Sequence, residues 1–96
     1  MTVIDHAERQ AALCRIFGNA RRLLILWMLS EEELSVNEIA ARAGSSVQNV
    51  SQHLSLLKKA GIVSTRREGQ MIYYHVIDQE CLEYCAALLQ APETHK

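Results

Sequence analysis

The stretch that decides the fold is Ser35–Gly61, which reads SVNEIAARAGSSVQNVSQHLSLLKKAG. Ser35, followed three residues later by Glu38, forms a capping box, in which two side chains satisfy backbone donors at a helix start. Gly44 supplies the positive φ that ends this first helix, and Ser46 is a suitable N-cap for the next one. The stretch therefore predicts two helices separated by a short turn.

The second helix, Val47–Ala60, has two unlike faces. Val50, Leu54 and Leu57 recur at helical spacing and predict a buried face. The opposite face is polar and carries no charge before Lys58, which suits a helix that reads base edges in a major groove. The candidate DNA contacts of this helix are Ser46, Gln48, Asn49, Ser51, Gln52, His53 and Lys58. Because polar faces are also the norm on solvated helices, the segment that follows has to decide between the two interpretations.

That next segment changes from helical to alternating periodicity. Met71–Val76 places Ile72, Tyr74 and Val76 on one face of a strand, and Val63–Arg66 is expected to pair with it across a turn over Arg67–Gln70. Arg66 and Arg67 are candidate contacts to phosphates or to the minor groove, although adjacent arginines at a turn are often only solvated. Directly after a recognition-helix pattern, this hairpin predicts a DNA-binding wing.

Positive charge is concentrated on the same part of the chain. The net charge of the whole chain is -1, which by itself argues against a nucleic-acid-binding protein. From Arg42 to Val76, however, five basic residues stand against Glu68 alone, a local charge of +4. Such a local excess is the footprint expected for phosphate binding. The acidic run Glu31–Glu33 is expected to lie in a solvated loop.

A series of motifs, in order and at a shared spacing, resembles one known family. The motifs are Asn19–Leu26, Glu33–Ala40, Val50–Leu54, Lys59–Val63, Arg66–Gln70 and Ile72–Tyr74. Together they resemble the ArsR/SmtB family of bacterial winged-helix repressors, over nearly the whole chain. The resemblance implies a mainly α winged helix-turn-helix with a small β-hairpin wing and a last helix after it. It also implies a homodimer that occupies an operator on double-stranded DNA until a signal weakens binding. A symmetric dimer requires that operator to be an inverted repeat.

Helices are predicted on both sides of the DNA-binding segment, at Thr2–Phe17, Ala20–Ser30 and Asp78–Leu89. Residues 1–96 are expected to form one domain. A domain of this size is marginally stable alone, and dimerisation commonly adds the missing stability. The last helix has a wide apolar surface, which fits a helix that covers its own core and a partner subunit. Trp27 is expected to pack inside, because a core position is commoner than a ligand-stacking role for tryptophan on an apolar helix.

No targeting or membrane-spanning segment is recognised in the sequence. Leu23–Leu29 is too short to cross a bilayer, and the first residues lack an apolar signal core. The protein is therefore expected to be cytoplasmic, with no membrane partner and with its cysteines as thiols.

The family's familiar signal sites look incomplete here. The resemblance implies a cysteine pair, in many metal sensors, at the positions of Ser35 and Asn37. It implies an aspartate and a histidine, in zinc sensors, at the positions of Asp78 and Glu80, and a persulfide-sensing cysteine at Trp27. None of these three sites is complete in this chain.

Three cysteines remain, Cys14, Cys81 and Cys85. Cys81 and Cys85 are four residues apart, so a helix presents both thiols on one face, and Cys14 lies on the helix expected to pack against that face. Together they can hold a thiophilic metal or metalloid ion such as arsenite, or be oxidised as a redox switch. They can equally be buried apolar filler, because cysteine is among the most buried residue types. The sequence leaves both interpretations open and indicates no other cofactor.

Other functions fit less well. An enzyme is not expected, because the chain has no Gly-rich phosphate loop and no nucleophile and base at a recognisable spacing. The alternatives are a winged helix used only to bind protein, and a DNA-binding regulator with no inducer site of its own. The concentrated positive charge favours a DNA-binding regulator, and the thiols favour a repressor released by a thiol-directed signal.

Overall fold

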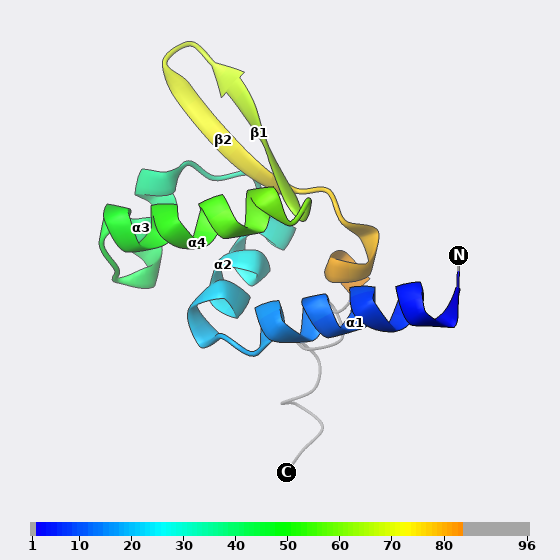
Figure 1. The fold of residues 1–96 in the computed structure, drawn as a ribbon. Coiled ribbons are helices and arrows are strands. Elements are labelled where there is room, and N and C mark those ends of the chain that lie inside the picture. Colours follow the sequence, from blue (N-terminus) through cyan, green and yellow to red (C-terminus); the bar gives the residue numbers. More distant parts are fainter. Residues whose placement is uncertain (1, 84–96) are drawn as a thin grey trace.

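The computed structural model describes residues 2–83 as four helices followed by a two-stranded hairpin and a last, short helical segment (Figure 1). The elements are α1 (Val3–Phe17), α2 (Ala20–Glu31), α3 (Val36–Ala43), α4 (Val47–Lys59), β1 (Val63–Glu68) and β2 (Met71–Val76). Residues 79–83 are helical, and the Asp78 carboxylate accepts a hydrogen bond from the Cys81 backbone N–H at 3.0 Å. Asp78 is thus the N-cap that the sequence predicts.

The predicted caps of the two central helices are confirmed. The Ser35 N–H donates to Glu38 Oε1 at 2.9 Å, and the Glu38 N–H donates to Ser35 Oγ at 3.2 Å. Gly44 has φ 64°, a left-handed conformation that closes α3 without steric cost for a residue lacking Cβ. Ser46 caps α4 by accepting the Asn49 N–H at 3.0 Å. These local interactions set the turn between α3 and α4.

The hairpin is longer than predicted. Its strands pair antiparallel from Val63 opposite Val76 to Glu68 opposite Met71, so the turn contains only Gly69 and Gln70. Arg66 lies within β1 as predicted, whereas Arg67 lies in β1 on its other face and not in the turn. Leu34 forms an additional β-bridge to Tyr74, which ties the loop after α2 to the wing.

One hydrophobic core joins the helices to the base of the hairpin. Leu26 of α2, Ile39 of α3 and Leu54 of α4 are fully buried in it. The prediction for Trp27 is wrong, because its side chain is 43% exposed. Helical spacing puts Trp27 on the side of α2 opposite Ile25, Leu26 and Leu29, which pack inward. Since the run Leu23–Leu29 of α2 is apolar throughout, its sequence did not distinguish the two faces.

The hairpin projects from the helical body on the side away from α1 (Figure 1). Arg9 of α1 pairs with Asp78 and with Glu80, the latter at 2.8 Å, which holds α1 against the start of the last helix. Within residues 2–83, no helix combines the length and apolar character needed to cross a membrane.

Candidate nucleic-acid interface

The exposed face of α4 is the centre of the candidate interface. Gln48, Gln52 and Ser55 follow one another at spacings of four and three residues, so they form one stripe along the helix. All three are exposed, whereas Val50, Leu54 and Leu57 on the opposite face are buried. Two unbranched amide side chains on one exposed stripe offer paired donors and acceptors, which is the chemistry that reads adenine in a major groove.

Ser51 and Lys58 border this stripe and are also exposed. Among residues 2–83, Lys58 has no carboxylate partner, since the ion pairs of this part of the chain belong to Arg9, Arg42, Arg66 and His75. Lys58 is therefore available to a phosphate at the C-terminal end of α4.

Three of the predicted contact residues have structural roles as well. Ser46 and Asn49 form the N-cap, and Asn49 Oδ1 also accepts the Ser45 hydroxyl at 3.0 Å. Asn49 is half-buried as a result. His53 is half-buried too, and burial, with the nearby Arg22 and Arg21, lowers its pKa below the ordinary 6.5. The neutral imidazole is favoured, so His53 is not a cationic phosphate contact at neutral pH.

The two wing arginines are not equivalent. Arg66 donates to Glu33 at 2.8 Å and to Glu68 at 3.1 Å, and its guanidinium lies 5.1 Å from the centre of the Tyr73 ring. These hydrogen bonds raise the pKa of Arg66. Arg67 donates only to the Gly69 carbonyl, at 3.2 Å, and has no carboxylate partner within the described part of the chain. Arg67 is thus the better placed of the two to bind a phosphate.

The acidic run predicted to be a solvated loop is used in ion pairs. Glu32 pairs with Arg42 of α3 at 2.8 Å, and Glu33 lies 3.5 Å from His75 Nδ1 as well as binding Arg66. Glu31 is the last residue of α2. The run therefore connects α2 to α3 and to the wing, because the fold brings separated charges together.

Sequence reasoning missed several residues of this surface. Val47 is 45% exposed at the start of α4, where an apolar side chain can contact a thymine methyl group. Helical spacing gave no signal for this exposure, because Val47 stands three residues before Val50 and seven before Leu54 and so falls on the apolar side of α4. Arg21 and Arg22 at the start of α2 lie close enough to His53 to affect its pKa. No local pattern indicates that proximity, because it depends on how the fold places the start of α2 relative to α4.

The predicted thiol site is not assembled within residues 2–83. Cys14 is exposed on α1, whereas Cys81 is fully buried in the core, and Cys85 lies outside the described residues. No group of three histidine, cysteine or acidic side chains in the described range is placed to hold a metal ion. The residues seen there do not fit a thiolate-bound metal or metalloid.

Comparison with known proteins agrees with this geometry. Residues 19–65 match the family model described as bacterial regulatory protein, arsR family. The transcriptional activator HlyU of Vibrio cholerae is 39% identical over 75 residues, which cover 78% of this chain and 69% of that protein. A HlyU structure from the same organism superposes with a TM-score of 0.85 at 35% identity, covering 90% of this chain and 94% of the other.

Three further similar proteins are a longer regulator, a homodimeric domain and an antimony-specific repressor. The regulator KmtR of Mycobacterium tuberculosis is 44% identical over 65% of this chain, but the match spans only 48% of KmtR. The homodimeric winged helix-turn-helix domain of Mb0332 from Mycobacterium bovis is 29% identical, with a TM-score of 0.82 and coverage of 99% and 90%. The antimony-specific repressor AntR is 28% identical, with a TM-score of 0.79 and coverage of 98% and 87%.

Proposed function

Because the chain belongs to the ArsR family of bacterial helix-turn-helix transcription regulators, we propose that it represses transcription by binding an inverted-repeat operator as a homodimer. DNA-binding regulation, and not catalysis, is what the family and the named relatives do. The observation that carries the proposal is the exposed amide stripe of α4 beside two cations, Lys58 and Arg67, that lack carboxylate partners in the described chain.

The division of labour within this surface follows from side-chain chemistry. Gln48 and Gln52 read base edges, with Val47 and Ser51 beside them in the groove. Lys58 and Arg67 bind phosphates on either side, which positions the helix but carries no sequence information. Arg66 joins them only by exchanging Glu33 or Glu68 for a phosphate. Ser46, Asn49 and His53 shape the surface and contact DNA only at its margin.

A homodimer is supported by apolar surface outside the core. Val3 and Ile4 at the start of α1 are 85% and 67% exposed, and Ile77 before the last helix is 54% exposed. Burying these side chains against a second copy removes apolar area from water. A two-fold dimer presents its two recognition helices to half-sites about 34 Å apart, which is why we propose an inverted repeat.

The direct test is a binding titration on the DNA upstream of the protein's own operon. We expect a saturable complex with an inverted repeat, protected over two successive major grooves, and a dimer by sedimentation at micromolar concentration. A winged helix used only to bind protein would shift neither specific nor random DNA. A monomer that binds a single half-site would contradict the dimer but not the DNA-binding function.

A thiol-directed release signal is the finer part of the proposal. It is supported by the exposure of Cys14 and by the similarity to AntR, which is named as antimony-specific. Since Cys81 is buried, Cys14 is the residue of the described pair that a reagent in solution meets first. We expect a thiol oxidant to lower operator affinity, and Cys14→Ser to remove that response while leaving untreated DNA binding unchanged. An undiminished response in Cys14→Ser, and in a variant lacking all three cysteines, would show that no thiol carries the signal.

A further inference from the structure

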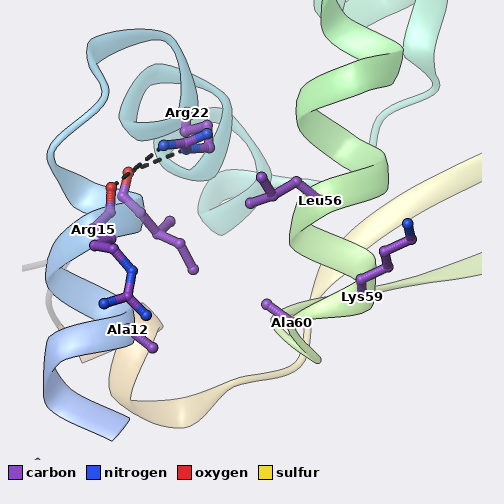
Figure 2. Close-up of a pocket in the computed structure, with 7 residues that line it drawn as sticks. Ala12, Arg15, Arg22, Leu56, Lys59 and Ala60 are labelled. Atoms are coloured by element: carbon purple, nitrogen blue, oxygen red, sulfur yellow. Dashed lines mark hydrogen bonds between the residues drawn. The ribbon is translucent and has the colours of Figure 1, made fainter. Parts of the chain in front are cut away.

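A hollow of about 430 Å³ lies where three helices meet (Figure 2). One wall comes from the C-terminal part of α1 and the first turns of α2, and the other comes from the C-terminal half of α4. The volume is within the range of about 300 to 1,000 Å³ that is usual for small-molecule sites. The hollow contains none of the amide stripe and no cysteine, so it is separate from the DNA-binding surface and from the thiols.

The lining is apolar at its centre. Ala12 of α1 lies across the hollow from Leu56 of α4 and from Ala60, the cap that follows α4 (Figure 2), and Ile16 of α1 also lines the hollow. Leu56 is 42% exposed, which leaves a large apolar side chain in contact with solvent at this wall. Ile16 is already buried in the core, so a ligand with an aliphatic or aromatic body gains free energy mainly by removing the exposed surface of Leu56 from water.

The remaining lining residues are all cationic. They are Arg15, Arg22 and Lys59, and no acidic residue lines the hollow. Arg22 is held in place by its hydrogen bonds to the backbone carbonyls of Arg15 and Ile16, at 3.4 and 3.5 Å (Figure 2). Arg15 and Lys59 have no ion pair within residues 2–83, unlike Arg9, Arg42 and Arg66, which bind carboxylates.

We propose that this hollow binds an organic anion: an acid group beside Arg15 with an aliphatic or aromatic body against Ile16 and Leu56. A planar guanidinium offers paired donors to a carboxylate, sulfonate or phosphate. Lys59 lines the opposite wall with its ammonium directed outward (Figure 2), and its flexible stem lets the charge turn toward a bound acid. A bare phosphate would use the cations and leave the apolar centre uncovered, so the combination favours an amphipathic ligand.

Binding in this hollow has a consequence for the proposed function, and this part of the inference rests on that function. The ligand contacts both α1, which we assign to the dimer interface, and α4, which we assign to DNA. Its negative charge would neutralise the positive charge of Arg15 and of Lys59, the last residue of α4, and would repel the DNA backbone. We therefore expect the anion to weaken operator binding by about fivefold or more, within the usual range of coupling between two sites.

The first test measures binding without DNA, so that its failure is distinct from a failure of the proposed function. Full-length protein is titrated with octanoate and with phenylbutyrate at up to millimolar concentration, and the ligand-induced NMR shifts are followed. We expect saturable shifts at Ala12, Ile16, Leu56 and Ala60. Octanamide, the neutral analogue, and inorganic phosphate are the matched probes, and each should bind at least about tenfold more weakly, because each lacks one of the two contacts.

Variants assign the charge contacts. Arg15→Gln should weaken octanoate binding by about tenfold, the decrease typical of removing one charge-assisted contact, and Lys59→Gln by a smaller factor. Lys58→Gln is the matched control, because Lys58 is its neighbour on α4 and does not line the hollow. Both Arg15 and Lys59 are exposed, so these variants should fold normally, which circular dichroism would check.

Four outcomes would overturn the inference. The first is that neither carboxylate shifts the resonances of the hollow residues at millimolar concentration. The second is that octanamide binds as tightly as octanoate, which would leave no role for the cations. The third is that inorganic phosphate binds as tightly as octanoate, which would leave a simple basic surface. The fourth is that the shifts follow protein concentration and not ligand, which would show that a second copy of the chain covers the hollow.

Discussion

Two regions of the molecule differ in how their functional side chains come together. The first is the helix-turn-helix with its wing, residues 35–76, and the second is the cysteine-bearing region, which consists of α1 and residues 78–83. In the first region, the side chains lie on one helix and on the hairpin that directly follows it. In the second, Cys14 and Cys81 come from opposite ends of the described chain, and one is exposed while the other is buried. Spacing along one element predicts a shared face, whereas shared chemistry on distant elements does not predict a shared site.

Leu54→Ala tests whether the first region depends on the common core. Leu54 is fully buried under the amide stripe, so its truncation should lower the free energy of unfolding by about 2 to 5 kcal/mol. Chemical denaturation measures the change. The neighbouring exposed residue supplies the control, since Ser55→Ala should alter stability by no more than about 0.5 kcal/mol. Equal effects of the two changes would mean that α4 does not bury the face that carries Leu54.

Thiol labelling sharpens the contrast within the second region. Cys14 is open to solvent, but Cys81 reacts only when the structure around it opens, so we expect Cys14 to react at least about a hundredfold faster. Mass spectrometry after timed exposure to iodoacetamide measures both rates. Similar rates would indicate that the structure around Cys81 opens readily, and the two thiols would then be equally accessible to reagents.

Gln52→Ala tests sequence reading by the amide stripe. If the amide makes a bidentate contact with a base, its removal should cost about 1 to 3 kcal/mol of operator binding and relax the preference at one base pair. Binding to operator and to random DNA is compared by fluorescence anisotropy. Gln79→Ala is the control, because Gln79 is an exposed glutamine on the other region. A Gln52 variant whose affinity fell equally for both DNAs would assign the residue to phosphate contacts.

The two wing arginines allow a finer comparison within the first region. Arg67→Gln should remove a phosphate contact and reduce the slope of log affinity against log salt by about 0.9 for each phosphate that is no longer neutralised. Arg66→Gln should have a smaller effect on DNA binding, because Glu33 and Glu68 already bind this guanidinium. The slopes are measured on random DNA over a range of salt. The reverse order of effects would show that Arg66 leaves its carboxylates when DNA is present.

The smallest expected effect is the pH dependence that comes from His53. Burial, together with Arg22 and Arg21, lowers its pKa in the folded protein below the ordinary value of 6.5. The unfolded chain therefore binds the proton more readily, so this contribution to stability is complete above pH 6.5 and is lost as the pH falls toward the folded-state pKa. In His53→Gln, the midpoint of unfolding should depend less on pH below pH 6.5. An unchanged pH profile would place His53 in solvent.

Much of the first region was predictable because its signals are local. The capping box of Ser35 and Glu38, the left-handed Gly44 and the cap at Ser46 each depend on residues within one turn of one another. The alternation of Met71–Val76 likewise predicted which residues of β2 share a face. The hairpin turn was misplaced because Arg67 and Glu68 extend β1 by pairing with Ile72 and Met71, which is a property of two strands together.

What the sequence by itself determined is the series of helices and strands, the buried and exposed faces of α4, and the family, because each rests on local backbone preferences and periodicity. Only the tertiary structure decided that Trp27 faces outward, that Glu33 engages Arg66, and that Arg15 and Lys59 line one hollow. It also decided that Cys14 is exposed and Cys81 buried. The physical reason is that burial and electrostatic partners depend on which distant elements pack together. The apolar run Leu23–Leu29 and an isolated charged residue have no sequence neighbours that indicate those elements.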